Sequence, residues 1–270
     1  MSRGGGSRVA LVTGGTRGIG LATGLALGAR GDRVVLTHAW GSADEDEVRA
    51  RFDAAAAPAP LIVQADVGRA EDTEALMETL ASWCDGVDVF VSNASLAAVP
   101  RSLDDYDERA LLKSVSYGAW PLVAYTRALH ATFARWPRYV VAMSSDGPDR
   151  FSVGYDFVAA SKSVLETLVR YLTWHLREED VRVNAVRSRG VRTESFERTF
   201  GPALLDHVRR LGLEDQLVPP EEVAGAAVAL TSGLMDAVRG QVLTVDRGGA
   251  FADNLLQIYA RRHALDGDLR

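Results

Sequence analysis

The stretch "TGGTRGIG", residues 13–20, follows the apolar run "RVALV" (8–12) and opens a helical segment. Gly14 permits a tight turn, Gly18 lets the backbone approach a pyrophosphate, and Gly20 allows a helix to pack closely on a strand. The helix that begins here offers free N–H groups and the positive end of its dipole to a phosphate. This turn at the first strand-to-helix junction predicts that the chain binds a dinucleotide.

Short apolar runs alternate with longer helical stretches along the rest of the chain. The runs are continuous in Val, Leu and Ile rather than alternating with polar residues, which is typical of parallel strands covered on both faces. The strand-like runs are 8–13, 33–38, 60–65, 87–92, 138–143, 181–186 and 241–245. The helical stretches are 18–30, 43–56, 70–84, 104–134, 155–179 and 220–231. Repeated units of this kind predict an α/β fold with a doubly wound parallel sheet and helices on both faces.

Composition excludes several classes of function. The 270 residues have a formal net charge of −6 and no basic run, so we do not expect a nucleic-acid partner. No apolar run reaches the roughly 18 residues of a membrane span, and the first residues are too polar for a signal peptide. The single Cys84 excludes an intrachain disulfide and fits a cytoplasmic protein. No Cys/His cluster has the spacing of metal ligands.

The chain has no composition break, linker or internal repeat, so we expect one domain over 1–270. Residues 8–186 should mainly bind the cofactor. Two segments interrupt the alternation, and segments at this edge of a sheet often cover the ligand. We expect 187–215 to form a substrate lid and 250–270 a C-terminal tail.

Apolar side chains in the lid and the tail suit a broad slot for a flat polyaromatic ligand. For any one of them, packing on the sheet or on a partner subunit is at least as good an explanation. They are Phe196 and Phe200 in the lid and Phe251, Leu255, Leu256, Ile258 and Tyr259 in the tail.

The end of the second strand indicates which nicotinamide cofactor is used. NAD enzymes usually place an acidic residue there for the ribose 2′-hydroxyl. Here "THAWGSAD" (37–44) has His38 and Ala39 at that point. Arg17 in the glycine turn and Ser42 beyond the strand favour a 2′-phosphate, so we predict NADPH. The alternative is that Arg17 is only a solvated loop residue.

Several motifs, taken in chain order, resemble those of a known family. They are the glycine turn with Thr13, "ADV" (65–67), "SNAS" (92–95), "AMSS" (142–145), "ASK" (160–162), "RVNAV" (182–186) with Thr193, "PPEEVAGAAVAL" (219–230) and "RGQVLTVD" (239–246). This set resembles the short-chain dehydrogenase/reductase family and covers nearly the whole chain. The resemblance implies a Rossmann-type seven-stranded sheet, commonly assembled as a homodimer or homotetramer.

The resemblance also implies roles for individual residues. It suggests catalytic roles for Ser145 and Lys162, with Ser95 and Tyr155 as further candidates. In this family the lysine bonds the nicotinamide ribose and supplies positive potential at the reacting oxygen. Together with the motif analysis, it gives these expected cofactor-binding residues: Gly14, Thr16, Arg17, Gly18, Ile19, Gly20, His38, Ser42, Asp66, Val67, Asn93, Ala94, Lys162, Val191 and Thr193.

The chain departs from the family at and around the residue that donates the proton. The family's active tyrosine stands four residues before the lysine, and Val158 occupies that position. The family's helix asparagine maps to about Val115, the last glycine of its "NNAG" to Ser95, and its later "PG" to Ser188 and Arg189. We therefore expect a normal cofactor site beside an altered source of the proton.

Two branches of the family resemble this arrangement. Enoyl-acyl-carrier-protein reductases have their tyrosine seven residues before the lysine, where this chain has Tyr155. The angucyclinone-type ketoreductases of antibiotic biosynthesis include members without the tyrosine. We favour an NADPH-dependent ketoreductase that acts on an aromatic polyketide. The alternatives are an NADPH-dependent enoyl-thioester reductase using Tyr155 and a non-catalytic NADPH-binding regulator.

Because valine cannot transfer a proton, another group must protonate the carbonyl oxygen. Losing a general acid typically costs roughly 10²–10⁴-fold in rate. Tyr155, Ser145 or Ser95, and a water chain ending near Lys162 are candidates, although an alcohol is a weak acid. The fourth candidate is a phenol of the substrate hydrogen-bonded to the ketone, which holds its proton at contact distance. We favour this substrate phenol.

Overall fold

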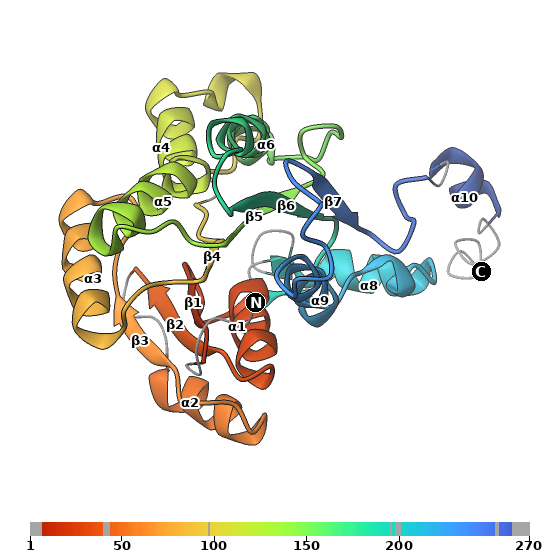
Figure 1. The fold of residues 1–270 in the computed structure, drawn as a ribbon. Helices are drawn as coiled ribbons and strands as arrows, with labels where there is room; N and C mark the ends of the chain where they lie inside the picture. Colours follow the sequence, from red (N-terminus) through yellow and green to blue (C-terminus); the bar gives the residue numbers. More distant parts are fainter. Residues whose placement is uncertain are drawn as a thin grey trace.

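A computed structural model of the chain describes residues 7–39, 44–96, 98–194, 196–197, 201–251 and 254–260. These residues form one parallel seven-stranded sheet in the order β3-β2-β1-β4-β5-β6-β7 (Figure 1). The strands are β1 (Val9–Val12), β2 (Arg33–His38), β3 (Leu61–Gln64), β4 (Val89–Ser92), β5 (Tyr139–Ser145), β6 (Arg182–Ser188) and β7 (Val242–Val245). The predicted fold class is confirmed.

Helices cover both faces of this sheet (Figure 1). The first face carries α3 (Ala70–Trp83), α4 (Glu108–Gly118), α5 (Trp120–Phe133) and α6 (Asp156–His175), and the second carries α1 (Gly18–Ala29), α2 (Glu45–Ala54) and α9 (Pro220–Leu230). Alternate strand residues enter the two cores: Leu11 and Phe90 pack on the first, Val12 and Val91 on the second. Burial on both faces explains why the strands are apolar at successive positions.

The predicted helical stretch 104–134 is two helices in the structure. A short 3₁₀ turn, η1 (Leu103–Asp105), precedes α4, and the chain breaks at Ala119 before α5 begins. Pro121 lies in the first turn of α5. It has no N–H to donate to the carbonyl of Tyr117, so it starts a new helix rather than continuing the old one.

The sheet order reverses between β1 and β4, which is where ligands bind in such sheets. The glycine turn leaves β1 at this point. Gly14 has a φ of +60°, a conformation that side chains disfavour. A Cβ added to Gly20 would lie 2.2 Å from the Gly14 carbonyl oxygen, so only glycine lets α1 start this close to the turn.

The lid and the tail contain α8 (Pro202–Arg210), η2 (Glu214–Gln216) and α10 (Asn254–Ala260). In Figure 1, α10 projects away from the sheet. Phe251, Leu256 and Tyr259 are 98%, 65% and 62% exposed, so the expectation that they line a slot is wrong for this structure. Apolar content did not indicate which way the tail runs. Phe200 and the side chains of Leu255 and Ile258 lie outside the described residues.

Within the part of the chain that the structure describes, no helix is both long enough and apolar enough to cross a membrane.

Substituting Gly20→Ala should displace the glycine turn, because the new Cβ would collide with backbone rather than with a movable side chain. We expect a loss of stability of roughly 1–3 kcal/mol and at least about tenfold weaker nicotinamide-nucleotide binding. Urea unfolding measures the change in stability, and fluorescence titration measures the change in nucleotide binding. Gly225→Ala is the control: its Cβ would meet nothing within 4 Å, and it should be neutral or slightly stabilising. Unchanged nucleotide binding in the Gly20 variant would contradict this account of the turn.

Candidate active site

Hydrogen bonds from β4 fix the glycine turn. Asn93 Nδ2 donates to the carbonyl oxygens of Thr13 and Gly14, both at 2.9 Å. The backbone N–H groups of Asn93 and Ala94 donate to Thr13 Oγ1 at 3.0 and 3.2 Å. Thr193, from the segment after β6, approaches the turn from another element: a Cβ on Gly18 would lie 3.4 Å from its Cγ2.

The start of α1 fits the pyrophosphate of a dinucleotide. Arg17 is the N-cap residue of α1 and provides no side-chain cap, so the helix begins with N–H groups left for a ligand. Thr16 and Ile19 flank it and are half-buried, whereas Arg17 is exposed. These residues, with Gly14, Gly18 and Gly20, would hold a nicotinamide dinucleotide.

Two expected contacts of the adenosine end lie at the ends of β2 and β3. His38 is 7% exposed, and neither ring nitrogen has a hydrogen-bond partner within the described residues. Its Nε2 is 3.7 Å from Glu45 Oε1 in the first turn of α2. Val67 is buried. Ser42 lies outside the described residues.

The carboxylate of Asp66, the third expected adenosine contact, already has protein partners. One oxygen accepts from the Gly68 N–H at 2.8 Å and the other from the Tyr117 hydroxyl at 3.0 Å. Sequence reasoning did not identify this role of Tyr117, although it noted the segment around it. Burial and the carboxylate of Asp66 raise the pKa of Tyr117.

Lys162 is buried in α6, facing β5. It is 5% exposed, and its Nζ donates to the Met143 carbonyl oxygen at 2.8 Å. Burial disfavours the charged form and lowers the pKa of Lys162 to about 8, while the negative charge of Glu166 opposes that shift. Lys113, the other lysine, is exposed and lies over the Tyr117 ring, as expected for a surface residue.

Sequence reasoning missed a buried carboxylate next to this lysine. Glu166 is 3% exposed and accepts from Ser144 Oγ at 2.6 Å and from two nitrogens of Arg187 at 3.0 and 2.6 Å. The only sequence signal was spacing, because Glu166 stands one helical turn after Lys162. Arg187 also pairs with Asp149.

Val158 fills the position of the family tyrosine with a buried apolar side chain, 4% exposed. Ser161 Oγ donates to the Val158 carbonyl oxygen at 2.8 Å. Ser95 is exposed and lies near this region: a Cβ on Gly118 would be 2.7 Å from Ser161 Oγ and 3.4 Å from Ser95 Oγ. Neither the apolar side chain of Val158 nor the hydroxyls of Ser161 and Ser95 can act as a strong acid at the position of the family tyrosine.

Tyr155 is the N-cap residue of α6 and packs its ring on Gly147. It lies two helical turns, roughly 10 Å along the axis, before Lys162, so the lysine does not adjoin it as it adjoins residue 158. Burial raises the pKa of Tyr155, and the nearby Ser145 hydroxyl only partly offsets this. The two hydroxyls do not reach hydrogen-bond geometry, since Ser145 Oγ has no partner among the described residues.

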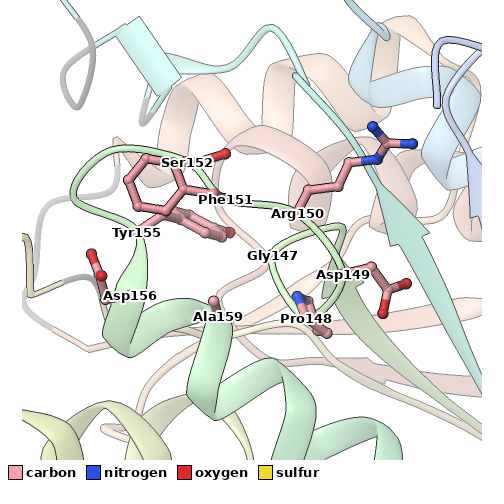
Figure 2. A pocket seen from close by; sticks show the side chains of 9 residues that line it. All are labelled: Gly147, Pro148, Asp149, Arg150, Phe151, Ser152, Tyr155, Asp156 and Ala159. Atoms are coloured by element: carbon pink, nitrogen blue, oxygen red, sulfur yellow. The ribbon is translucent and has the colours of Figure 1, made fainter. Parts of the chain in front are cut away.

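A hollow of about 310 Å³ opens beside Tyr155. Figure 2 shows Phe151 and Tyr155 on its wall, with Ala159 in the first turn of α6. Its volume is at the lower end of the roughly 300–1,000 Å³ range of small-molecule sites. The structure thus places Tyr155 and Phe151 on one hollow, and Ser145 is not among the residues that line it.

Arg189, at the position of the family's "PG" glycine, holds the loop after β5 to the tail. Its Nε lies 3.4 Å from Asp146 Oδ2, and its Nη1 donates to the Gly249 carbonyl oxygen at 2.7 Å. Arg150 donates to the Ala250 carbonyl oxygen. Burial raises the pKa of Asp146, and the charge of Arg189 opposes that shift. These two arginines tie the first residues of the tail to the loop after β5, and Gln216 Nε2 donates to Gln257 Oε1 of α10 at 2.8 Å.

Val191 is buried and pairs with Val218 in an isolated bridge before α9, so it fixes the segment that brings Thr193 over the turn. Cys84 is half-buried, and burial raises the pKa of its thiol. Among the described residues, no group of three or more His, Cys, Asp or Glu could hold a metal ion.

A family model described as Enoyl-(Acyl carrier protein) reductase matches residues 14–250. The chain belongs to this family, within the short-chain dehydrogenase/reductase superfamily. It is an NAD(P)-dependent reductase, and NAD(P)H is the cofactor typical of such enzymes.

Relatives of this short-chain reductase have different named activities. The 1-cyclohexenylcarbonyl-CoA reductase of Streptomyces collinus is 28% identical over 250 residues, covering 89% of this chain and 86% of that protein. Versicolorin reductase 1 of Aspergillus parasiticus is 27% identical over 261 residues, covering 90% and 96%. The crystal structure of an actinorhodin polyketide ketoreductase with NADPH has a TM-score of 0.80 at 24% identity, covering 90% and 97%. Family membership alone does not distinguish ketone from enoyl reduction.

The buried lysine predicts a pH-dependent stability. Its pKa is about 8 in the folded protein and ordinarily 10.5, so the unfolded chain binds more protons between these values. Below pH 8 the free energy of unfolding is therefore lowered by the whole penalty for burying the charged lysine. This penalty disappears as the pH rises to 10.5. Relative to a Lys162→Met variant, the wild type should gain roughly 3 kcal/mol of unfolding free energy across this window. Urea unfolding of both proteins from pH 7 to 10.5 measures the difference, and parallel curves would contradict a depressed lysine pKa.

Proposed function

We propose that this protein is an NADPH-dependent ketoreductase that reduces a carbonyl of an aromatic, angucyclinone-type polyketide in antibiotic biosynthesis. The main support is Val158, a buried apolar residue at the position of the family's acid, in a site that retains Lys162 and Ser145. Such a site suits a substrate that brings its own proton. A hollow bordered by Phe151 and Tyr155 suits a flat aromatic ring.

The choice of NADPH is supported by the end of β2 and by the glycine turn. His38 and Ala39 provide no carboxylate for a ribose 2′-hydroxyl. Arg17 is exposed in the glycine turn, with no side-chain partner assigned within the described residues, and can pair with a 2′-phosphate. Glu45, 3.7 Å from His38, is an acidic group that opposes this choice, and it is exposed on α2.

The chain's own residues would stabilise the alkoxide formed on reduction. Bound NADPH supplies the hydride. Ser145 Oγ, which has no hydrogen-bond partner among the described residues, can donate to the carbonyl oxygen. Lys162 supplies positive charge from a buried position, where electrostatic interactions are strong.

The proton would come from the substrate. Val158 has none to give, and the raised pKa of Tyr155 makes its phenol a weaker acid than an ordinary tyrosine. A phenol of the substrate beside the ketone already lies within hydrogen-bond distance of the carbonyl oxygen. Its transfer is intramolecular and needs no protein acid.

A second candidate function is enoyl-thioester reduction with Tyr155 as the acid. Tyr155 stands seven residues before Lys162 and lines the hollow, and the matching family model is described by that activity. A third candidate is a non-catalytic NADPH-binding regulator. The retention of both Lys162 and Ser145 disfavours a regulator, which has little need for either.

A substrate comparison distinguishes these candidates. We expect NADPH oxidation at 340 nm with an angucyclinone ketone that has a neighbouring phenol, a lower rate with NADH, and none with a crotonyl thioester. Turnover of the thioester alone would establish the enoyl reductase. Tight NADPH binding without turnover of either compound would leave the regulator.

Tyr155→Phe should keep most of the ketone reductase activity, within about threefold of wild type, because the phenol is not the proposed donor. A loss of roughly 10²-fold or more would assign the acid role to Tyr155. Tyr171→Phe is the matched control, since Tyr171 is 65% exposed on the same helix and should be silent. Steady-state kcat/KM for the wild type and the two variants shows whether Tyr155 is the acid.

A further inference from the structure

Glu166 is enclosed by donors from two neighbouring strands. Ser144 on β5 and Arg187 on β6 are directly paired in the sheet register, so both side chains leave the sheet on the same face. Ser144 Oγ donates to Glu166 Oε1, and Arg187 donates to both carboxylate oxygens, Nε to Oε1 and Nη2 to Oε2. These three hydrogen bonds hold the buried carboxylate in one place.

Two side chains of α6, one turn apart, therefore hold two successive residues of β5. Lys162 Nζ bonds the carbonyl oxygen of Met143, and Glu166 accepts from the hydroxyl of Ser144. Ser145, the proposed partner of the carbonyl, is the next residue of the strand. Its position depends on these two bonds, since it is at the end of β5.

Arg187 also keeps Glu166 and Lys162 apart. No ion pair within 4.0 Å joins Lys162 to Glu166 among the described residues, because Arg187 binds both carboxylate oxygens and Lys162 bonds a carbonyl instead. Glu166 acts on the lysine through its field rather than by direct contact. Without Arg187, a direct pair would draw the ammonium away from Met143.

The other charged groups around Lys162 come from each neighbouring element. The loop after β5 contributes Asp146, paired with Arg189, and Asp149, paired with Arg187, together with the phenol of Tyr155. On the packed helices α4 and α5, Lys113 and Arg127 are exposed. In this set Glu166 is buried and its partner Arg187 is partly buried, with 4% and 14% of their side chains exposed.

We propose that Glu166 and Arg187 are positioning residues with two roles. They hold Ser145 and Lys162 in place, and their opposite charges set the electrostatic balance that keeps Lys162 a cation. Val158, rather than a tyrosine, stands one turn before that lysine. The consequence for catalysis rests on the proposed ketoreductase function. The effect of the two charges on Lys162 does not rest on that function, because it concerns the protein without substrate.

The two charges predict opposite effects on Lys162. Glu166→Gln removes the buried anion and leaves Arg187 paired only with the exposed Asp149 among the described residues, so the lysine should lose its proton more readily. Arg187→Gln removes the cation and leaves Glu166 unbalanced, so the lysine should hold its proton more tightly. A role confined to packing has no reason to give shifts of opposite sign.

The chain has only two lysines, Lys113 and Lys162, which makes a direct measurement possible. Protein labelled with ¹³Cε-lysine would give two NMR signals, assigned with a Lys113→Arg variant and titrated from pH 6 to 11. We expect the midpoint of Lys162 to fall by at least about half a pH unit in Glu166→Gln and to rise by a similar amount in Arg187→Gln. Shifts of the same sign, or none, would overturn the proposal.

Further variants keep the test decisive if a single charge removal prevents folding. Arg187→Lys keeps the charge and should leave the midpoint near that of wild type, and Glu166→Gln with Arg187→Gln removes both charges and should give an intermediate value. Arg138→Gln is the matched control, because Arg138 pairs with Asp236 beside the opposite end of β5 and should not shift the signal. A shift in that control equal to those of the site variants would also overturn the proposal.

Enzyme assays separate this proposal from the proposed function. The alkaline limb of kcat/KM for the ketone should move with the NMR midpoint, to lower pH in Glu166→Gln and to higher pH in Arg187→Gln. If no ketone is reduced but the NMR shifts are opposite, the proposed function fails and the electrostatic role stands. If the ketone is reduced and the shifts are absent, the positioning role fails.

Discussion

The site depends on keeping a positive charge inside the protein. Lys162 lies almost fully buried, where desolvation lowers its pKa to about 8, and its ammonium bonds a backbone carbonyl of β5. A buried cation is tolerable when an anion balances it, and Glu166 provides that anion without contacting the lysine directly. Arg187 in turn holds the carboxylate in place, so one chain of interactions links α6, β5 and β6 at the edge of the sheet where the glycine turn would bind the nucleotide.

Val158 separates two functions that one tyrosine usually combines. In the family, the tyrosine gives the proton and the neighbouring lysine lowers its pKa. In our proposal Lys162 provides the positive charge here and Val158 provides no acid, while Tyr155 is two helical turns from the lysine and has a raised pKa. In the proposed cofactor half of the site, Asn93 bonds the glycine turn. These facts favour a change in the source of the proton over a loss of the whole reaction.

The fold could be predicted because its signals are local. Runs of Val, Leu and Ile marked the strands, and the glycine turn marked the first junction. The site was accessible only in part: Ser145 and Lys162 stand in motifs, but the contact of Glu166 with Arg187 depends on the register of β5 on β6 and has no motif. In the tail, by contrast, the sequence suggested a feature that the structure does not have. Its apolar residues suggested a slot, yet α10 projects away from the sheet, since composition does not fix the direction of a segment (Figure 1).

The most direct test of the central claim is a comparison of two ketones that differ only in the phenol beside the carbonyl, each reduced by wild type and by a Val158→Tyr variant. If the substrate supplies the proton, wild type should reduce the ketone without the phenol at least about 10²-fold more slowly, and the variant should recover part of that loss. Equal kcat values for the two ketones in the wild type would contradict the account and place the proton donor in the protein or its water.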